Sequence, residues 1–395
     1  MKTKSIKKQN NKKVKSKRVG VKRGPYKKRA KKSTFVNILL KLILILCIII
    51  AAYYFMLNFD DIFNIDQTTN TTNVYNNTNK PITFKDKYIG NLDYKKYPFL
   101  KEDLKDKGIE LNDDDINYNA RNIDNIVRGK DGWVFYIGAN EKKILEGERF
   151  ISAEWFMNSA NMMDELKKIC DEQGKEVYFL IVPMKELIYS EYLPDGFMEK
   201  QNDKDDLALF SQYTNEKRGL NLLYPLDFMK KAKEFVRLYF SKDVHWNQIG
   251  GYIATEDLYD KIGKTPKPLS SCDFMKINES PNGDYDYEVT YKGDGEVLTF
   301  DTHGKEIAYA NLVESTSDAP DDREITVVGD SFRYWIYNVL QHDFKKSNII
   351  HKSILKNKEA KDVLKRSDII VIQVLSEAYG ELPYMAANII NQIKD

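Results

Sequence analysis

The chain has 395 residues with 61 Lys and Arg, 59 Asp and Glu and three cysteines, which excludes a small domain held together by disulfides. Its charge is divided unevenly, because residues 1–32 contain 16 basic residues and no acidic one, and the next charged residue is Lys41. Removing these seventeen from the total leaves 44 basic residues against all 59 acidic ones from Phe59 onward. The composition therefore describes a basic tail joined to an acidic body with a net charge of −15.

Residues 35–57 form an apolar run of 23 residues between tail and body. About 20 such residues cross a bilayer as a helix. Lys41 stands near one end, where it can snorkel, and Tyr53 and Tyr54 stand where an interfacial aromatic belt would lie. A cleaved signal peptide is the main alternative, but its apolar region is usually shorter and is followed by small residues. We predict an uncleaved transmembrane anchor over residues 35–57.

The basic tail, residues 1–34, predicts the orientation of this anchor. Positive charges favour the cytoplasmic side, so the tail should be cytoplasmic and everything after Asn58 should lie outside the membrane. Nucleic-acid binding is the competing interpretation of these charges. Tethering at a membrane gives the tail a simpler topogenic or anionic-lipid role, so we expect a single-pass cell-membrane protein without a nucleic-acid partner.

The segment that follows the anchor is poor in apolar residues. Residues 64–81, NIDQTTNTTNVYNNTNKP, are too polar to bury a core, and residues 58–119 as a whole are weakly patterned. We predict a stalk or linker over residues 58–119. Order resumes at residues 127–138, VRGKDGWVFYIG, where KDG is turn sequence and WVFYI predicts a strand.

Beyond residue 120, strand patterns alternate with helix patterns. Continuous apolar runs predict strands buried on both faces, and runs with a period near 3.6 predict helices. We expect helices at 152–174, 205–216 and 247–263, with Ser152 and Asn247 as N-caps, and strands at 176–183, 220–225, 324–332 and 367–375. This alternation predicts an α/β domain over residues 120–395, with a doubly wound parallel sheet and helices on both faces.

One segment breaks the alternation of strands and helices. Residues 285–313 alternate apolar and polar side chains around Gly293-Asp294-Gly295 and His303-Gly304. This pattern predicts an antiparallel β-hairpin inserted into the α/β domain.

Two short motifs lie where a parallel sheet would present a site. Gly-Asp-Ser places Ser331 at the end of a buried strand, and FSKDVHWNQIGG places Asp243 and His245 just ahead of a helix. Ligands bind at the carboxyl ends of strands in open α/β sheets, and N–H groups at a helix terminus suit an oxyanion. A serine hydroxyl becomes a nucleophile when a base takes its proton. Together the motifs predict a catalytic triad of Ser331, His245 and Asp243.

Each motif also has a structural interpretation. Gly-Asp-Ser can be ordinary turn sequence, and Asp-x-His can be a helix-capping loop or half of a metal site. The metal site lacks a third ligand at helical or hairpin spacing, and no CxxC pair or His/Cys cluster suggests zinc, so we expect no metal. Cys47 lies inside the predicted anchor, which leaves Cys170 and Cys272 as cysteines that could form one disulfide.

Four segments in order, GKDGWVFY, VYFLIVPMKELIYSEYLP, DVHW and GDSF, resemble the alginate O-acetyltransferase AlgJ/AlgX family of the SGNH hydrolase superfamily. The resemblance covers roughly residue 125 to the C-terminus. It implies a flavodoxin-like SGNH hydrolase-like fold with Ser331 as nucleophile, His245 as base and Asp243 as the orienter of the base. The glycine and asparagine blocks that complete the oxyanion hole of ordinary SGNH hydrolases are not recognisable, so only the Ser331 N–H is assigned to the hole.

Other positions have two interpretations each. Trp246, beside the base, can line the site or only pack, and packing is favoured because large aromatic side chains are mostly core residues. Lys185 matches a family lysine, but surface exposure is the default for a lysine. The remaining histidines have no partner pattern and are expected to be structural or exposed; they are His303, His342 and His351.

The resemblance implies a membrane-anchored extracytoplasmic O-acetyltransferase that passes acetyl groups, through an acetyl-serine, to hydroxyls of a secreted or cell-surface polysaccharide. The sequence has no nucleotide-binding signature, so we expect no cofactor, and the resemblance implies a membrane-bound O-acyltransferase (MBOAT) partner as acetyl donor. An esterase with the same triad and a non-catalytic scaffold of a polysaccharide-export complex are the alternatives. Residue types cannot distinguish whether sugar or water reaches the acyl-enzyme.

Overall fold

The computed structural model describes residues 82–102, 125–146, 151–197, 205–278, 285–292, 299–301 and 310–394. The predicted cytoplasmic tail and the predicted anchor lie outside these ranges. Within them, no helix combines the length and the apolar composition that crossing a bilayer requires. The described part of the chain begins inside the predicted stalk.

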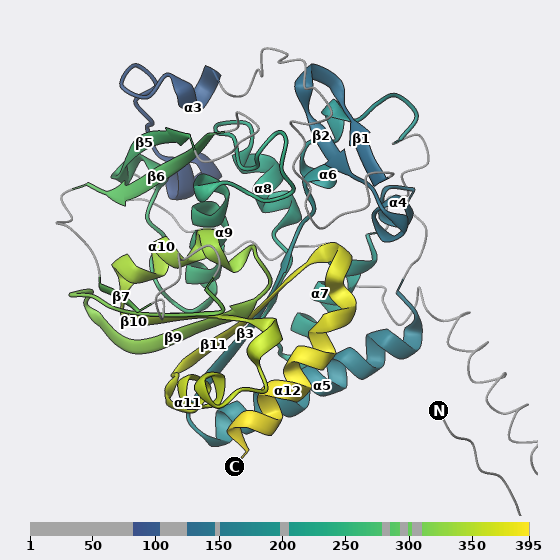
Figure 1. Ribbon diagram of the computed structural model, residues 1–395, viewed down its shortest axis with the longest axis vertical. Helices are drawn as coiled ribbons and strands as arrows, with labels where there is room; N and C mark the ends of the chain where they lie inside the picture. Colours follow the sequence, from purple (N-terminus) through teal and green to yellow (C-terminus); the bar gives the residue numbers. More distant parts are fainter. Residues whose placement is uncertain are drawn as a thin grey trace, which may run out of the picture. The chain divides into compact units, whose positions relative to one another are not determined.

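A seven-stranded sheet forms the centre of the described part, in the order β4-β3-β11-β9-β10-β8-β7 (Figure 1). The strands from β4 to β10 in this order are parallel, whereas β8 pairs antiparallel with both β10 and β7. The sheet is therefore mixed and not wholly parallel as predicted. The bounds are β3 Glu176–Val182, β4 Leu222–Leu223, β7 Thr299–Asp301, β8 Leu312–Thr316, β9 Asp321–Gly329, β10 Phe344–His351 and β11 Ile369–Leu375.

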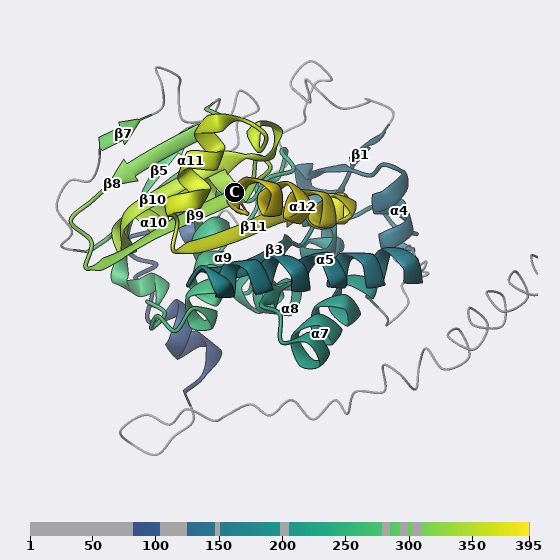
Figure 2. The same ribbon diagram turned by 90° about the horizontal axis from the view of Figure 1, so that it is seen from below.

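Helices cover both faces of this sheet (Figures 1 and 2). One face packs against α5 Ala153–Glu172, α11 Lys358–Arg366 and α12 Leu382–Ile393. The other packs against α10 Arg333–Asp343, which in turn contacts α9 Gln248–Lys261. The predicted α/β class with two helical layers is confirmed. The smaller elements are α3 Phe99–Glu102, α4 Ala139–Leu145, α6 Lys185–Ile188, α7 Asp206–Arg218, α8 Leu226–Ala232, β1 Ile126–Arg128, β2 Val134–Tyr136, β5 Cys272–Asn278 and β6 Tyr285–Tyr291.

Three adjacent strands of the sheet, β3, β11 and β9, have apolar stretches in their sequences. β11 is buried along its whole length, and β3 and β9 are buried over their last six residues. Strands that are covered on both faces have no polar side to expose, so they read as continuous apolar runs and show no alternation. The predicted helix caps are also present, because the Ser152 side chain accepts from Trp155 N and that of Asn247 accepts from Gly250 N.

The sequence does not predict β10, although this strand lies next to β9 in the sheet. Lys345 and Lys346 are exposed while Ser347 and Asn348 are buried, so the strand begins with no apolar run. The buried amide of Asn348 is satisfied inside the sheet, since Nδ2 donates to Glu324 Oε1 at 2.8 Å and to Thr326 Oγ1 at 3.0 Å. Partners supplied by a neighbouring strand cannot be read from the local sequence.

The predicted antiparallel pairing over residues 285–313 is confirmed for β7 and β8 and is wrong for β6. β6 pairs antiparallel with β5, which precedes the predicted segment, and the two form a separate two-stranded sheet. β7 and β8 pair with each other and join the main sheet through β10. The alternating pattern identifies strands correctly, but it carries no information about which strand each one pairs with.

Part of the predicted stalk packs against the body. Ile89 and Leu100 are completely buried in the core, although charged residues surround both in the sequence. Lys96 Nζ lies 2.8 Å from Asp273 Oδ1, and the Tyr97 hydroxyl donates to the same carboxylate. Residues 82–102 therefore belong to the folded body.

Cys170 and Cys272 do not form the disulfide that the sequence left open. Both thiols are free and buried, Cys170 in α5 and Cys272 at the start of β5. Burial raises the pKa of each thiol to about 12, which keeps both protonated and unreactive.

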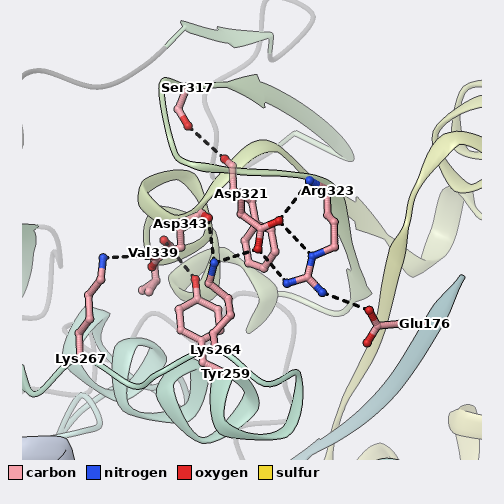
Figure 3. Close-up of polar contacts among 10 residues, drawn as sticks. Glu176, Tyr259, Lys264, Lys267, Ser317, Asp321, Arg323, Val339 and Asp343 are labelled. Atoms are coloured by element: carbon pink, nitrogen blue, oxygen red, sulfur yellow. Dashed lines mark hydrogen bonds and ion pairs between the residues drawn. The ribbon is translucent and has the colours of Figure 1, made fainter.

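A cluster of charged side chains joins the amino-terminal ends of β3 and β9 to the carboxyl-terminal ends of α9 and α10 (Figure 3). Lys264 Nζ lies 3.0 Å from Asp321 Oδ2 and 3.1 Å from the Asp343 carbonyl oxygen. Hydrogen bonds from Arg323, and then from Lys264, hold the pKa of the Asp321 carboxyl well below its usual range. We call this set of residues the basal charge cluster; its members are Glu176, Lys264, Lys267, Asp321, Arg323 and Asp343.

Candidate active site

Ser331 lies at the carboxyl edge of the sheet, opposite the basal charge cluster. It is exposed between the last residue of β9, Gly329, and the first residue of α10, Arg333. A Cβ atom on Gly329 would lie 2.2 Å from Gln373 Oε1 on the adjacent strand β11. Glycine therefore leaves room for the buried side chain of Gln373, which a Cβ atom would displace. The Gly-Asp-Ser sequence therefore follows from packing as well as from chemistry.

Asp330 fixes the turn that carries Ser331. Its Oδ1 accepts from Phe332 N at 3.0 Å and from Gln373 Nε2 at 2.9 Å, and its Oδ2 accepts from Leu375 N at 2.9 Å. One carboxylate thus binds the start of α10 and the end of β11. Sequence reasoning missed this role, because Asp330 was considered only as part of the Gly-Asp-Ser motif.

The predicted base lies on a short loop that folds back on itself. Tyr239 and Trp246 form an isolated antiparallel bridge, and Phe240 N donates to the His245 carbonyl oxygen at 3.1 Å. A Cβ atom on Gly250 would lie 2.1 Å from the Leu238 carbonyl oxygen, so the first turn of α9 packs tightly against the segment that leads into the loop. This packing brings residues 240–245 to the carboxyl edge of the sheet.

The structure brings the three predicted site residues into one hydrogen-bonded chain. His245 Nε2 lies 2.6 Å from Ser331 Oγ, and His245 Nδ1 lies 2.5 Å from Asp243 Oδ1. The same Asp243 oxygen accepts from the His245 backbone N–H at 2.8 Å. Serine and histidine are 86 positions apart in the sequence, and their contact arises from the meeting of the β9 turn and the α9 loop.

Two aromatic rings hold the imidazole of His245. The Trp335 ring stacks on it with centroids 4.9 Å apart and an angle of 30°, and the Phe332 ring lies 4.7 Å away at 43°. Trp246 is completely buried and its Nε1 donates to the Phe332 carbonyl oxygen at 3.0 Å. The packing role predicted for Trp246 fits this position, and its hydrogen bond also links the base loop to α10.

The electrostatics of the site keep Asp243 ionised. Burial opposes its charge, but the charge of His245, hydrogen bonds from the His245 ring and backbone, and the charge of Lys185 together outweigh burial. They hold the pKa of the Asp243 carboxyl well below its usual range. An ionised carboxylate at Nδ1 fixes the tautomer in which Nε2 is free to accept a proton from serine.

Lys185 corrects the prediction of a surface lysine. It is buried, and its ammonium group contacts backbone carbonyl oxygens of the base loop and of β2. Backbone oxygens occur at every position of a chain, so these contacts of Lys185 leave no pattern in the sequence.

The other predicted positions lie apart from this chain of hydrogen bonds. His351 ends β10, beside Gly329, and burial together with the positive charge of Arg333 lowers its pKa to about 4. His342 lies in α10, and His303 lies outside the described residues. Among the residues that the structure describes, the Ser331 N–H has no hydrogen-bond acceptor, and no group of three His, Cys, Asp or Glu could hold a metal.

Residues 126–365 match the family described as SGNH hydrolase-like domain, acetyltransferase AlgX, over more than half of the chain. The chain belongs to this family. The resemblance to the AlgJ/AlgX family drawn from four sequence segments is thereby confirmed.

This AlgX-family chain is also similar to individual proteins. A stretch of 171 residues is 26% identical to the probable alginate O-acetylase AlgJ of Pseudomonas putida, covering 43% of this chain and 40% of that protein. The match thus spans about two fifths of that relative's length. Among solved structures, Bacillus cereus PatB1 is 18% identical with a TM-score of 0.49, over 65% of this chain and 96% of that one. The O-acetyltransferase domain of P. putida AlgJ is 14% identical with a TM-score of 0.42, over 67% and 99%.

Proposed function

We propose that this protein is a membrane-anchored, extracytoplasmic O-acetyltransferase that acetylates hydroxyls of a secreted or cell-surface polysaccharide. The observation that carries the proposal is the hydrogen-bonded chain from Ser331 through His245 to Asp243, at the exposed carboxyl edge of the sheet. Membership of a family described by acetyltransferase AlgX supports the acetyl group as the one transferred.

The geometry suits a two-step acyl transfer. His245 Nε2 takes the proton of Ser331 as its Oγ attacks the acetyl carbonyl, and the leaving group of the donor departs with that proton. The Ser331 N–H, at the start of α10, is placed to donate to the oxyanion. In the second step His245 takes the proton of a sugar hydroxyl, whose oxygen attacks the acetyl-serine. The Ser331 oxygen leaves with the proton, so the enzyme returns to its starting state.

The donor and the membrane attachment complete the proposal. The sequence carries no nucleotide-binding signature. From the resemblance to the AlgJ/AlgX family we propose that an MBOAT partner delivers acetyl groups across the membrane. The anchor predicted at 35–57 would raise the effective concentration of the domain at that partner. Protease added to intact spheroplasts should digest residues beyond 58; a body that is cut only after lysis would contradict this topology.

Hydrolysis is the competing outcome at the same site. Ser331 is exposed, so water can reach an acyl-enzyme as readily as a sugar can. We expect the full-length protein in detergent to release acetate from p-nitrophenyl acetate. Added oligosaccharide should gain acetyl groups while free acetate falls by the same amount. Acetate release that no acceptor changes would identify an esterase instead.

A further inference from the structure

A buried lysine lies beneath the loop that carries Asp243 and His245. Lys185 begins α6, just beyond the carboxyl end of β3, and only 1% of its surface is exposed. We propose that Lys185 is a positioning residue that holds this loop in the conformation required for proton transfer. The inference rests on the proposed acyl-transfer function of Ser331 and His245.

The ammonium group of Lys185 contacts four backbone carbonyl oxygens. Its Nζ lies 2.5 Å from the oxygen of Val134, 2.7 Å from that of Asp243, 3.2 Å from that of Ser241 and 3.3 Å from that of Phe240. An ammonium has three N–H donors and no acceptor, so these contacts suit two short hydrogen bonds and one that the two longer contacts share. Because these four oxygens can only accept hydrogen bonds, they favour the charged ammonium form of Lys185, which can only donate them.

Three of the four acceptors belong to the base loop, and the fourth belongs to β2. The loop is closed at its neck by the bridge between Tyr239 and Trp246, whereas Lys185 binds its interior. Val134 N also donates to the Ser241 carbonyl oxygen at 2.8 Å. The loop is thus joined to β2 both by this hydrogen bond and by the ammonium group of Lys185, which contacts both. Lys185 therefore fixes the loop against β2, close to the carboxylate that orients His245.

The surroundings of Lys185 show why a cation is present and not an apolar side chain. Its Nζ lies 5.1 Å from the Phe135 ring centroid and 5.7 Å from that of Trp133, and both rings are buried. Cation–π contacts offset part of the cost of burying the charge. A methionine would fill the same volume at lower desolvation cost, but it would leave several carbonyl oxygens of the loop without a donor.

The first test replaces Lys185 and follows acylation of Ser331 in the full-length protein, with p-nitrophenyl acetate as the probe and the release of p-nitrophenolate as the signal. Displacement of a catalytic group by about 1 Å costs on the order of 10²-fold in rate. We expect Lys185→Met to slow acylation by about 10²-fold at saturating probe while the half-saturating probe concentration changes less than threefold. A folded Lys185→Met protein that is acylated within threefold of the wild-type rate would overturn the proposal.

Lys175 provides a matched control at the other end of the same strand. Its Nζ donates to the carbonyl oxygens of Lys365 and Ser367 at 2.7 and 2.6 Å, so it also binds backbone acceptors, but far from Ser331 along β3. Lys175→Met should leave acylation unchanged. If Lys185→Met does not fold, the arginine variant Lys185→Arg tests the proposal in its place. Its planar group cannot bring one nitrogen to four converging oxygens, so a tenfold loss is expected and a wild-type rate refutes the proposal.

A second measurement does not depend on acetyl transfer. The proton between His245 Nδ1 and Asp243 should give a strongly downfield ¹H NMR signal, and Lys185→Met should remove it while far-UV circular dichroism is unchanged. If the wild-type protein transfers no acetyl group but Lys185→Met still removes this signal, the proposed function is refuted and the positioning role of Lys185 is retained. Persistence of the signal, with wild-type acylation at Ser331, would refute the positioning role alone.

Discussion

Alanine at Ser331 or at His245 is expected to abolish acetyl transfer, with a loss of about 10⁴- to 10⁶-fold for either variant. The two side chains act as a unit, because their 2.6 Å contact is the path by which the hydroxyl loses its proton. Serine without its base is a weak nucleophile, and the base without serine has no acyl group to transfer. The double variant should therefore be little slower than either single one, measured as acetyl transfer to oligosaccharide by the full-length protein.

Ser353 is a matched control for this experiment. Its Oγ lies 2.6 Å from Nδ1 of His351, so the molecule contains a second serine-histidine pair at the same edge of the sheet. Because its pKa is lowered to about 4, His351 is a poor base, and Ser353→Ala should keep full activity. Wild-type polymer acetylation in a deletion strain that carries Ser331→Ala would contradict the catalytic role and favour a scaffold.

Asparagine at Asp243 is expected to reduce the rate of acyl transfer by about 10²- to 10⁴-fold without unfolding the protein. The carboxylate accepts from both the ring and the backbone of His245, whereas an amide can donate to the ring and stabilise the tautomer that cannot accept the serine proton. The measurement is the acylation rate of the variant against pH, with circular dichroism as the control for folding.

The shape of that pH profile distinguishes two reasons for a lower rate in Asp243→Asn: loss of the carboxylate charge and displacement of the loop that carries His245. The low pKa of the Asp243 carboxyl keeps it ionised over the whole working range, so protonation of this carboxyl should add no limb to the profile of the wild type. Asp243→Asn removes an anion that stabilises imidazolium, and the acidic limb should therefore move to lower pH. A limb that stays in place while the rate falls would show that Asp243 acts through loop geometry alone.

The sequence identifies the parts of the fold that rest on local chemistry. β3, β9 and β11 are recognisable because burial on both faces demands uninterrupted apolar residues, and the cap at Asn247 because a helix start needs an acceptor. The proximity of Ser331 to the Asp243-His245 pair is predictable for the same reason. Each lies between a strand-like run and a helix, so the direction of parallel strands predicts the edge on which they meet.

Features that depend on distant partners escaped sequence reasoning. β10 is held by buried Ser347 and Asn348, whose partners come from neighbouring strands, and β6 pairs with β5 where the sequence suggests a local hairpin. Lys185 binds backbone oxygens, which every residue possesses and which therefore leave no pattern in a sequence. The pairing partner of a strand and the burial of a charged side chain depend on contacts that form only when the whole sheet has assembled.

The position of the basal charge cluster has a consequence for redesign of the protein. α9 and β9 carry the base loop and the nucleophile turn at one end, and Lys264 and Asp321 tie their opposite ends together. The register between the two elements is thus set at a distance from the loops around Ser331. If the proposed function holds, those loops can be exchanged for a different sugar acceptor while the spacing of Ser331 and His245 is preserved, without renewed optimisation of the scaffold.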